Sequence, residues 1–183
     1  MSNLPRFVAL CGHPGVGKSE VQSILAAIFG YEPVDDGWCM RDFAIRHLGA
    51  SIEDVMTQEG KARTVTLAGG QTMTWRKFLG EFGNRIEDLL GPDAIAEMAA
   101  MRCKPGKLYS FGSVRREQGR VFQRHGGVVV GIRRPGVGPS PHEFDRFNEE
   151  LVDFWLDNDT DLLRLEHKVF ALGEKLRAAR IAA

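Results

Sequence analysis

Residues 7–28 of this chain read FVALCGHPGVGKSEVQSILAAI. Phe7 to Cys11 form a short apolar run that ends at a glycine, which predicts a buried β-strand. Residues 12–17 are mostly turn formers and predict a loop. From Ser19 onward apolar residues recur at the spacing of a helix, at Val21, Ile24, Leu25 and Ile28. The stretch therefore predicts a strand, a glycine-rich loop and a helix in immediate succession.

The loop satisfies the P-loop pattern Gly-x-x-x-x-Gly-Lys-Ser. Glycines let the backbone turn its N–H groups toward phosphate oxygens, and the helix adds the positive end of its dipole. Lys18 would reach the β- and γ-phosphates, and the Ser19 hydroxyl would bind Mg²⁺. A glycine turn with an exposed lysine does not explain the flanking strand and helix. The residues expected to bind ATP are Gly12, His13, Pro14, Gly15, Val16, Gly17, Lys18 and Ser19.

The whole chain has 183 residues, which suits a single domain over 1–183. Lys and Arg balance Asp and Glu at 24 each, so neither a nucleic-acid polymer nor a membrane is an expected partner. Three cysteines without C-x-x-C spacing indicate no disulfide framework and no zinc site. No signal peptide or membrane-spanning run is visible, so we expect a cytoplasmic protein. The sequence is compatible with a monomer or a homodimer.

Strand and helix signals alternate along the rest of the chain, which predicts an α/β fold. We expect a doubly wound parallel sheet of about five strands with helices on both faces. Further strands are predicted at 31–34, 108–111, 128–132 and 154–156, and helices at 40–48, from the N-cap Thr74, at 92–103, around Val121 and Phe122, and after a cap at 157–160. A small hairpin is predicted where 65–67 and 71–73 flank two glycines.

Two segments stand apart from this alternation. Residues 37–91 are long enough to form an insertion that binds the acceptor of a reaction. Residues 136–141 contain only glycine, proline, valine and serine, and predict an irregular loop.

Several arginines are predicted to lie near helix starts or strand ends. Singly, each is explained as a solvated surface residue. As a set at the carboxyl ends of parallel strands, they suit the charge that phosphoryl transfer spreads over oxygens. The short chain and the lack of an Asn-Lys-x-Asp guanine motif favour a small kinase. The set comprises Arg41, Arg76, Arg115, Arg133 and Arg134.

The chain resembles the deoxynucleoside monophosphate kinases encoded by bacteriophages, along nearly its whole length. The segment Thr74-Trp75-Arg76-Lys77-Phe78-Leu79 is similar to that family's Arg-x-Leu-Leu-Gln helix. Val114-Arg115, Gly126-Gly127 and Arg134-Pro135-Gly136 follow its order Asp-Val-Arg, Gly-Gly, Arg-Pro-Gly. Further similar segments are Met40-Arg41-Asp42-Phe43-Ala44, His142 after the loop, and Asp153 with Asn158-Asp159.

This resemblance implies ATP and Mg²⁺ as cofactors and a deoxynucleoside monophosphate as partner. Arg41, Arg76 and Arg115 would hold the acceptor, with Asp42 either orienting Arg41 or complementing the helix dipole. Arg134 would bind ATP and reach the transferring phosphoryl group. The loop 136–141 would belong to a lid over about 133–150 that closes and excludes water from the site. The catalytic residues would be Lys18, Arg115 and Arg134.

The chain departs from the family where Ser113 replaces the aspartate of Asp-Val-Arg. Magnesium would then rest on Ser19, the phosphates and water, and Asp35 or Asp36 is either a further ligand or part of a polar turn. His13 either contacts phosphate or faces solvent. His142 either belongs to the lid or has no role, and the stripe Trp75, Phe78 and Phe82 is predicted to be core.

Three hypotheses for the function follow from these observations. The first is a kinase that transfers the γ-phosphoryl group of ATP to a deoxynucleoside monophosphate. The second is a P-loop kinase with another small acceptor. The third is a nucleotide-binding module with impaired catalysis, since Ser113 lacks a carboxylate.

Overall fold

The computed structural model describes residues 3–181, and the side chains as far as residue 178. Two compact units make up the chain. One unit runs to Asp36 and resumes at Ala96, and the other comprises Gly37–Ile95. Each unit is described by itself below.

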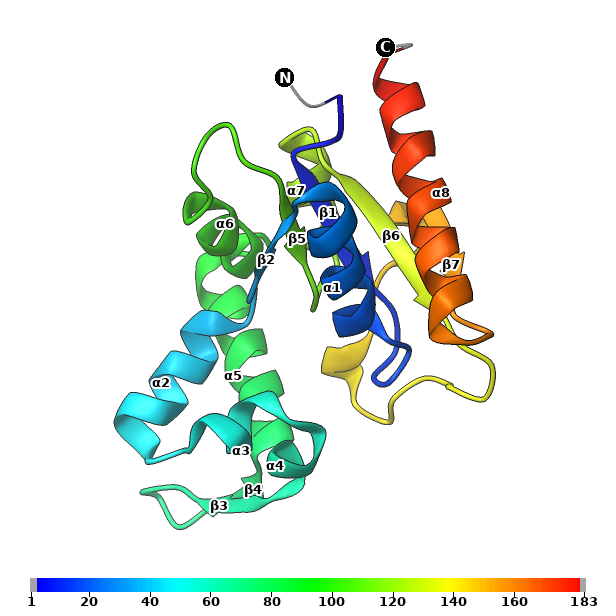
Figure 1. The fold of residues 1–183 in the computed structure, drawn as a ribbon. Coiled ribbons are helices and arrows are strands. Elements are labelled where there is room, and N and C mark those ends of the chain that lie inside the picture. Colours follow the sequence, from blue (N-terminus) through cyan, green and yellow to red (C-terminus); the bar gives the residue numbers. More distant parts are fainter. Residues whose placement is uncertain (1–2, 182–183) are drawn as a thin grey trace. The chain divides into compact units, whose positions relative to one another are not determined.

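The first unit contains a five-stranded sheet in the order β2-β5-β1-β6-β7 (Figure 1). Every pair of neighbouring strands in this sheet is parallel. Ala9, at the centre of β1, pairs with Phe111 on one side and with Val129 on the other. The predicted parallel sheet of about five strands is confirmed. The strands are β1 (Phe7–Cys11), β2 (Glu32–Val34), β5 (Tyr109–Phe111), β6 (Val128–Arg133) and β7 (Phe154–Asp157).

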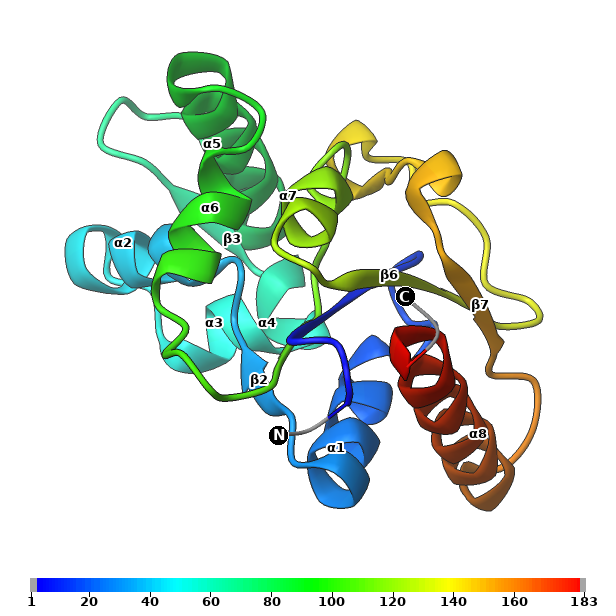
Figure 2. The ribbon, with the colours of Figure 1, turned by 90° about the horizontal axis from the view of Figure 1, so that it is seen from above.

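Helices cover both faces of this sheet, as predicted (Figure 2). Because side chains alternate along a strand, Val8 and Leu10 of β1 pack on one face, with α1 (Lys18–Phe29) and α8 (Leu162–Ile181). Phe7, Ala9 and Cys11 pack on the other face, with α6 (Ala94–Met101) and α7 (Gly119–Arg124). All five residues of β1 are buried. The loop that follows β1 therefore starts from the most enclosed strand of the unit.

The second unit contains four helices and a hairpin. Residues 64–66 and 72–74 pair in antiparallel fashion, which confirms the predicted hairpin. The Thr74 hydroxyl accepts a hydrogen bond from the Lys77 N–H and caps α5, as predicted. Gly83 lets α5 approach α2, because a Cβ there would lie 2.7 Å from Met40 Sδ. The elements are α2 (Trp38–Leu48), α3 (Ile52–Met56), α4 (Gln58–Ala62), β3 (Thr64–Thr66), β4 (Thr72–Thr74) and α5 (Trp75–Leu90).

Some predicted boundaries were wrong. The cap of α8 is Asp161, whose carboxylate accepts from the Arg164 N–H at 2.9 Å, and not residues 157–160. Pro92 lies in a turn, and α6 begins at Ala94. The helix predicted around Val121 and Phe122 is the short α7, which begins at Gly119. Among the residues that the structure describes, no helix is long and apolar enough to cross a membrane.

Part of the segment between β6 and β7 packs against the rest of the first unit. Two 3₁₀ helices, η1 (Glu143–Asp145) and η2 (Glu149–Leu151), follow an irregular stretch over 134–142. Phe144 and Asp145 are buried. Phe147 forms a β-bridge with Arg116, and the Asn148 N–H donates to the Arg116 carbonyl at 3.1 Å. Within the predicted lid segment, residues 143–148 are therefore packed on the unit.

Candidate functional site

The loop after β1 has the backbone shape that the P-loop pattern predicts. Gly12, Gly15 and Gly17 have φ values of 135°, 86° and 99°, which side-chain-bearing residues rarely adopt. A Cβ on Gly12 would lie 2.5 Å from the Ile132 carbonyl oxygen, and one on Gly17 would lie 2.4 Å from Asn158 Nδ2. Glycine is therefore required at positions 12 and 17 for space as well as for conformation.

The Lys18 ammonium group lies against this loop. Lys18 Nζ donates hydrogen bonds to the Gly12 carbonyl at 2.7 Å and the His13 carbonyl at 3.0 Å. Burial and, to a smaller extent, the nearby Arg115 guanidinium lower the pKa of Lys18 to about 8. A polyphosphate would offer this ammonium anionic acceptors in place of neutral carbonyls, so the arrangement favours anion binding.

Two buried carboxylates, those of Asp145 and Asp36, lie near Lys18 and Arg115. Asp145 Oδ1 lies 3.5 Å from Arg115 Nη2, and the Asp145 side chain is only 4% exposed. Asp36 Oδ2 accepts a hydrogen bond from the Ser113 N–H at 2.9 Å. Burial raises the pKa of Asp36, and the Arg115 guanidinium partly offsets this effect. The end of β2 and the segment after β5 thus meet beside the P-loop.

The oxygen atoms present suit a magnesium ion. Ser19 is exposed at the first turn of α1, and Asp36 supplies a buried carboxylate beside the same loop. Magnesium prefers oxygen ligands and keeps several waters and phosphate oxygens, so a few protein ligands are enough. Among residues 3–181, no cluster of three or more His, Cys, Asp or Glu side chains could bind a metal by itself. Ser19 and Asp36 are the residues that would hold Mg²⁺ together with a triphosphate.

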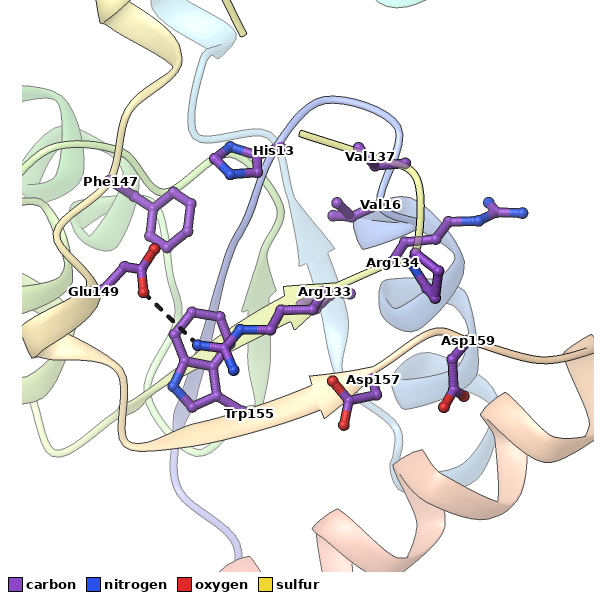
Figure 3. Close-up of a pocket in the computed structure, with 12 residues that line it drawn as sticks. His13, Val16, Arg133, Arg134, Val137, Phe147, Glu149, Trp155, Asp157 and Asp159 are labelled. Atoms are coloured by element: carbon purple, nitrogen blue, oxygen red, sulfur yellow. Dashed lines mark ion pairs between the residues drawn. The ribbon is translucent and has the colours of Figure 1, made fainter. Parts of the chain in front are cut away.

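A pocket of about 460 Å³ opens beside the loop (Figure 3). The Arg133 guanidinium stacks on the Trp155 ring, with 3.5 Å between Cζ and the ring centroid. Arg134 also lines the pocket, but its guanidinium points away from Trp155 (Figure 3). Arg133 is the last residue of β6, whereas Arg134 begins the irregular stretch that follows the strand. The lining residues are His13, Val16, Ile132, Arg133, Arg134, Pro135, Val137, Phe147, Glu149, Trp155, Asp157 and Asp159.

The two histidines that the sequence singled out lie in different surroundings. The His13 ring lines this pocket and faces Phe147, with 5.6 Å between the ring centroids. His142 stacks on Phe144, with 4.8 Å between the centroids and 8° between the planes. His142 therefore packs at the start of η1, on the ordered part of the 133–150 segment.

The remaining predicted acceptor residues belong to the second unit. Asp42 accepts a hydrogen bond from Arg46 Nε at 2.8 Å, one helical turn away. Arg41 packs against Gly37, since a Cβ on Gly37 would lie 3.3 Å from Arg41 Cζ. Arg76 donates to Gln58. Asp42 thus pairs with Arg46, an alternative that the sequence did not suggest.

Asn158 is a site residue to which the sequence gave no role. Its side-chain amide is buried and donates to the Val16 carbonyl at 2.9 Å, while its main-chain N–H donates to the Arg133 carbonyl at 2.7 Å. It therefore connects the ends of β6 and β7 to the P-loop. The resemblance had marked Asn158-Asp159, and this was the signal available. Asp145 had no comparable sequence signal.

Comparison with known proteins supports the fold. A dephospho-CoA kinase from Campylobacter jejuni matches with a TM-score of 0.50 and 13% identity, over 98% of this chain and 99% of that chain. A shikimate kinase from Aquifex aeolicus matches with a TM-score of 0.50 and 17% identity, over 92% and 96%. The chain has a P-loop kinase fold. No protein-family model matches the sequence, and no curated protein matches it significantly.

Proposed function

We propose that this protein is a kinase that transfers the γ-phosphoryl group of Mg²⁺·ATP to a deoxynucleoside monophosphate, giving ADP and the diphosphate. The observation that carries the proposal is the Lys18 ammonium group, which lies on the carbonyls of a P-loop with Arg115 nearby. Two positive groups next to N–H donors suit the charge that develops on a transferring phosphoryl group.

In this proposal the protein positions the reactants and neutralises charge, and forms no covalent intermediate. Lys18 and the loop N–H groups bind the β- and γ-phosphates. Arg115 is held by Asp145 and faces the γ-phosphoryl group. Arg134 reaches the same group only after the irregular stretch 134–142 closes, because its guanidinium points away from the pocket in the structure. Magnesium, held by Ser19 and Asp36, would neutralise phosphate charge.

The identity of the acceptor rests on the resemblance to bacteriophage kinases. In that family's order of segments, Arg41 and Arg76 would bind the phosphate and base side of the monophosphate. Both belong to the 37–95 unit, which we propose to be the acceptor-binding part of the chain. Guanidinium groups bind phosphate oxygens in a bidentate manner, so arginines suit a monophosphate acceptor.

A second candidate is a kinase for a small alcohol. The observation that favours it is Asp36, a buried carboxylate with a raised pKa at a strand end beside Lys18. An alcohol must lose a proton as it attacks, and a carboxylate with a raised pKa can accept it. The structural neighbours include a protein named shikimate kinase and one named dephospho-CoA kinase. A monophosphate acceptor needs no such base.

The test is ADP release with Mg²⁺·ATP and a panel of acceptors. The panel contains the deoxynucleoside and ribonucleoside monophosphates, shikimate, gluconate and dephospho-CoA, and the control is Lys18→Ala. We expect a deoxynucleoside monophosphate to raise turnover above the Lys18→Ala background. Turnover only with an alcohol acceptor selects the second candidate. Binding of ATP that is lost in Lys18→Ala, with no phosphorylated product, selects a nucleotide-binding module without catalysis.

A further inference from the structure

Arg116 has a backbone conformation that its residue type does not favour. Its φ is 44°, and among residues 3–181 it is the only residue other than glycine with a positive φ. The Gln118 N–H donates to the Arg115 carbonyl at 2.9 Å, so residues 115–118 form a hydrogen-bonded turn with Arg116 in second place. Turns with a positive φ in second place favour glycine, asparagine or aspartate there. The turn is therefore strained, and other contacts must hold it.

Residues 146–148 support this turn on one side. The Arg116 N–H donates to the Arg146 carbonyl at 2.8 Å, and the Arg116 carbonyl accepts from the Asn148 N–H at 3.1 Å. The Asn148 side-chain amide donates to Glu117 Oε1 at 2.9 Å. Strained conformations persist only where the surrounding structure fixes them, and they cluster at functional sites. The turn 115–118 is such a position, and it lies beside the P-loop.

The side chain of Gln118 supports the same turn from the interior. Gln118 is buried, and its Oε1 accepts a hydrogen bond from the Arg115 N–H at 3.0 Å. Gln118 therefore binds both main-chain groups of Arg115, the N–H with its side chain and the carbonyl with its main chain. Gln118 is also the N-cap residue of α7, but its side chain does not cap that helix. Its side-chain oxygen is thus directed at Arg115 and not at the helix.

Arg115 is the arginine that lies nearest to the chemistry proposed above. Its guanidinium affects the pKa of both Lys18 and Asp36, and its Nη2 lies 3.5 Å from Asp145 Oδ1. Asp145 restrains the tip of this side chain, whereas the turn determines the direction in which the side chain leaves the backbone. A long side chain amplifies a rotation of its backbone. Relaxation of the turn would therefore move the guanidinium away from the P-loop.

We propose that Gln118 is a positioning residue for phosphoryl transfer. By binding both main-chain groups of Arg115, it stabilises the strained turn 115–118 and holds the Arg115 guanidinium next to the transferring phosphoryl group. Gln118 itself does not touch that group and acts only through Arg115. A positive group that is already in place needs no rearrangement when charge develops, so loss of Gln118 slows the transfer step more than it weakens ATP binding. This inference rests on the proposed function, because it concerns the same phosphoryl group.

The experiment measures two quantities in the whole protein. One is the pair kcat and KM with Mg²⁺·ATP and each deoxynucleoside monophosphate. The other is the NMR order parameter of the Arg115 Nε–Hε group without ligand, with Arg115→Ala to assign the signal. The test variants are Gln118→Met, Gln118→Glu and Arg116→Val.

Two matched controls separate positioning from general packing. Gln123→Met removes an amide of the same helix, which donates to the Leu151 carbonyl at 3.0 Å and to the Asp153 carboxylate. Arg116→Gly removes the same side chain as Arg116→Val. Glycine suits a positive φ, however, whereas a β-branched valine opposes it.

We expect Gln118→Met to lower kcat about tenfold while the KM for ATP changes by less than about twofold, and to lower the Arg115 order parameter. Gln118→Glu keeps an acceptor for the Arg115 N–H and should recover most of this loss. Arg116→Val should lower kcat and the order parameter in the same way as Gln118→Met. Gln123→Met and Arg116→Gly should match the wild type in both measurements.

Two results would overturn the inference and leave the proposed kinase function intact. One is a wild-type kcat or a wild-type Arg115 order parameter in Gln118→Met. The other is an equal fall of kcat in Gln118→Met and Gln123→Met, which would reflect lost packing alone. If Gln118→Met does not fold, the comparison of Arg116→Val with Arg116→Gly gives the same decision. If the wild type phosphorylates no deoxynucleoside monophosphate, the proposed function fails, and the NMR comparison alone decides whether Gln118 positions Arg115.

Discussion

The side-chain amide of Asn158 donates a hydrogen bond to the main-chain carbonyl of Val16 at 2.9 Å. The same amide nitrogen lies only 2.4 Å from the position that a Cβ on Gly17 would occupy. The loop after β7 and the P-loop are therefore fitted to each other at one buried contact. The shape of the phosphate site depends on a residue 142 positions away in the sequence.

We expect Asn158→Asp to weaken triphosphate binding at least tenfold. A carboxylate cannot donate to the Val16 carbonyl, and it adds negative charge beside the phosphates. Loss of a buried hydrogen bond should also lower the free energy of unfolding by about 1–3 kcal/mol. Calorimetry with ATP and denaturant unfolding measure the two effects. Wild-type values in both measurements would contradict the role given to Asn158.

We expect Gly17→Ala to be more damaging than Gly15→Ala. Both positions have positive φ, so both substitutions introduce backbone strain of about 1–3 kcal/mol. Only the Gly17 substitution also adds a clash with Asn158, because nothing lies within 4 Å of a Cβ on Gly15. Unfolding by denaturant and ATP affinity should rank the variants in that order. The reverse order would show that the loop adopts another shape in solution.

We expect triphosphate affinity to fall as the pH rises above about 8. Lys18 has a pKa of about 8 against an ordinary value of 10.5, so its ammonium loses its proton early. The affinity should then fall by up to about tenfold per pH unit. Burial raises the pKa of Cys11 to about 12, so this thiol stays neutral over the pH range in which Lys18 loses its proton.

The effect on stability has the opposite sign. Between about pH 8 and 10.5 the native state binds fewer protons at Lys18 than the unfolded state does. The contribution of Lys18 to the free energy of unfolding therefore rises with pH across that window. Lys18→Arg should abolish both pH dependences, because arginine stays charged. Equal pH profiles for wild type and Lys18→Arg would exclude Lys18 as the titrating group.

We expect Arg115→Ala to lower kcat by about 10²–10³-fold, as for other groups that stabilise developing charge. It should also destabilise the protein by about 1–3 kcal/mol, because the buried Asp145 loses a positive neighbour. Asp145→Asn should lower kcat less, since Arg115 keeps its charge. Steady-state kinetics and a double-mutant cycle separate the two residues. Additive effects would mean that Asp145 does not position Arg115.

The sequence predicted those parts of the fold that local signals specify. The strand, loop and helix over residues 7–28 each have their own pattern, and the structure agrees with all three. The short helices α3 and α4 were not predicted, because each has five residues, too few to show a helical periodicity. The cap of α8 was misplaced because Asp157, Asp159 and Asp161 all qualify as N-cap residues by type.

The candidate site was less predictable, since tertiary packing assembles it. Arg133 and Arg134 are neighbours of one type, and Arg133, the last residue of β6, is the one that stacks on Trp155 of the paired strand β7. Asp145 reaches Arg115 because η1 packs against the rest of the first unit. Phe147 joins the pocket through a bridge to Arg116. Such contacts between distant segments leave no periodic pattern in one sequence.

The order of strands in the sheet has a consequence for how the chain folds during synthesis. In the part of the chain that the structure describes, β2 pairs with β5, and β1 pairs with β5 and β6, so the consecutive strands β1 and β2 are not partners. The whole 37–95 unit is made before β5 exists. A nascent chain that ends before Tyr109 therefore exposes the apolar strand β1 and leaves β1 and β2 without the strand that lies between them, and this is the stage at which it should depend most on chaperones.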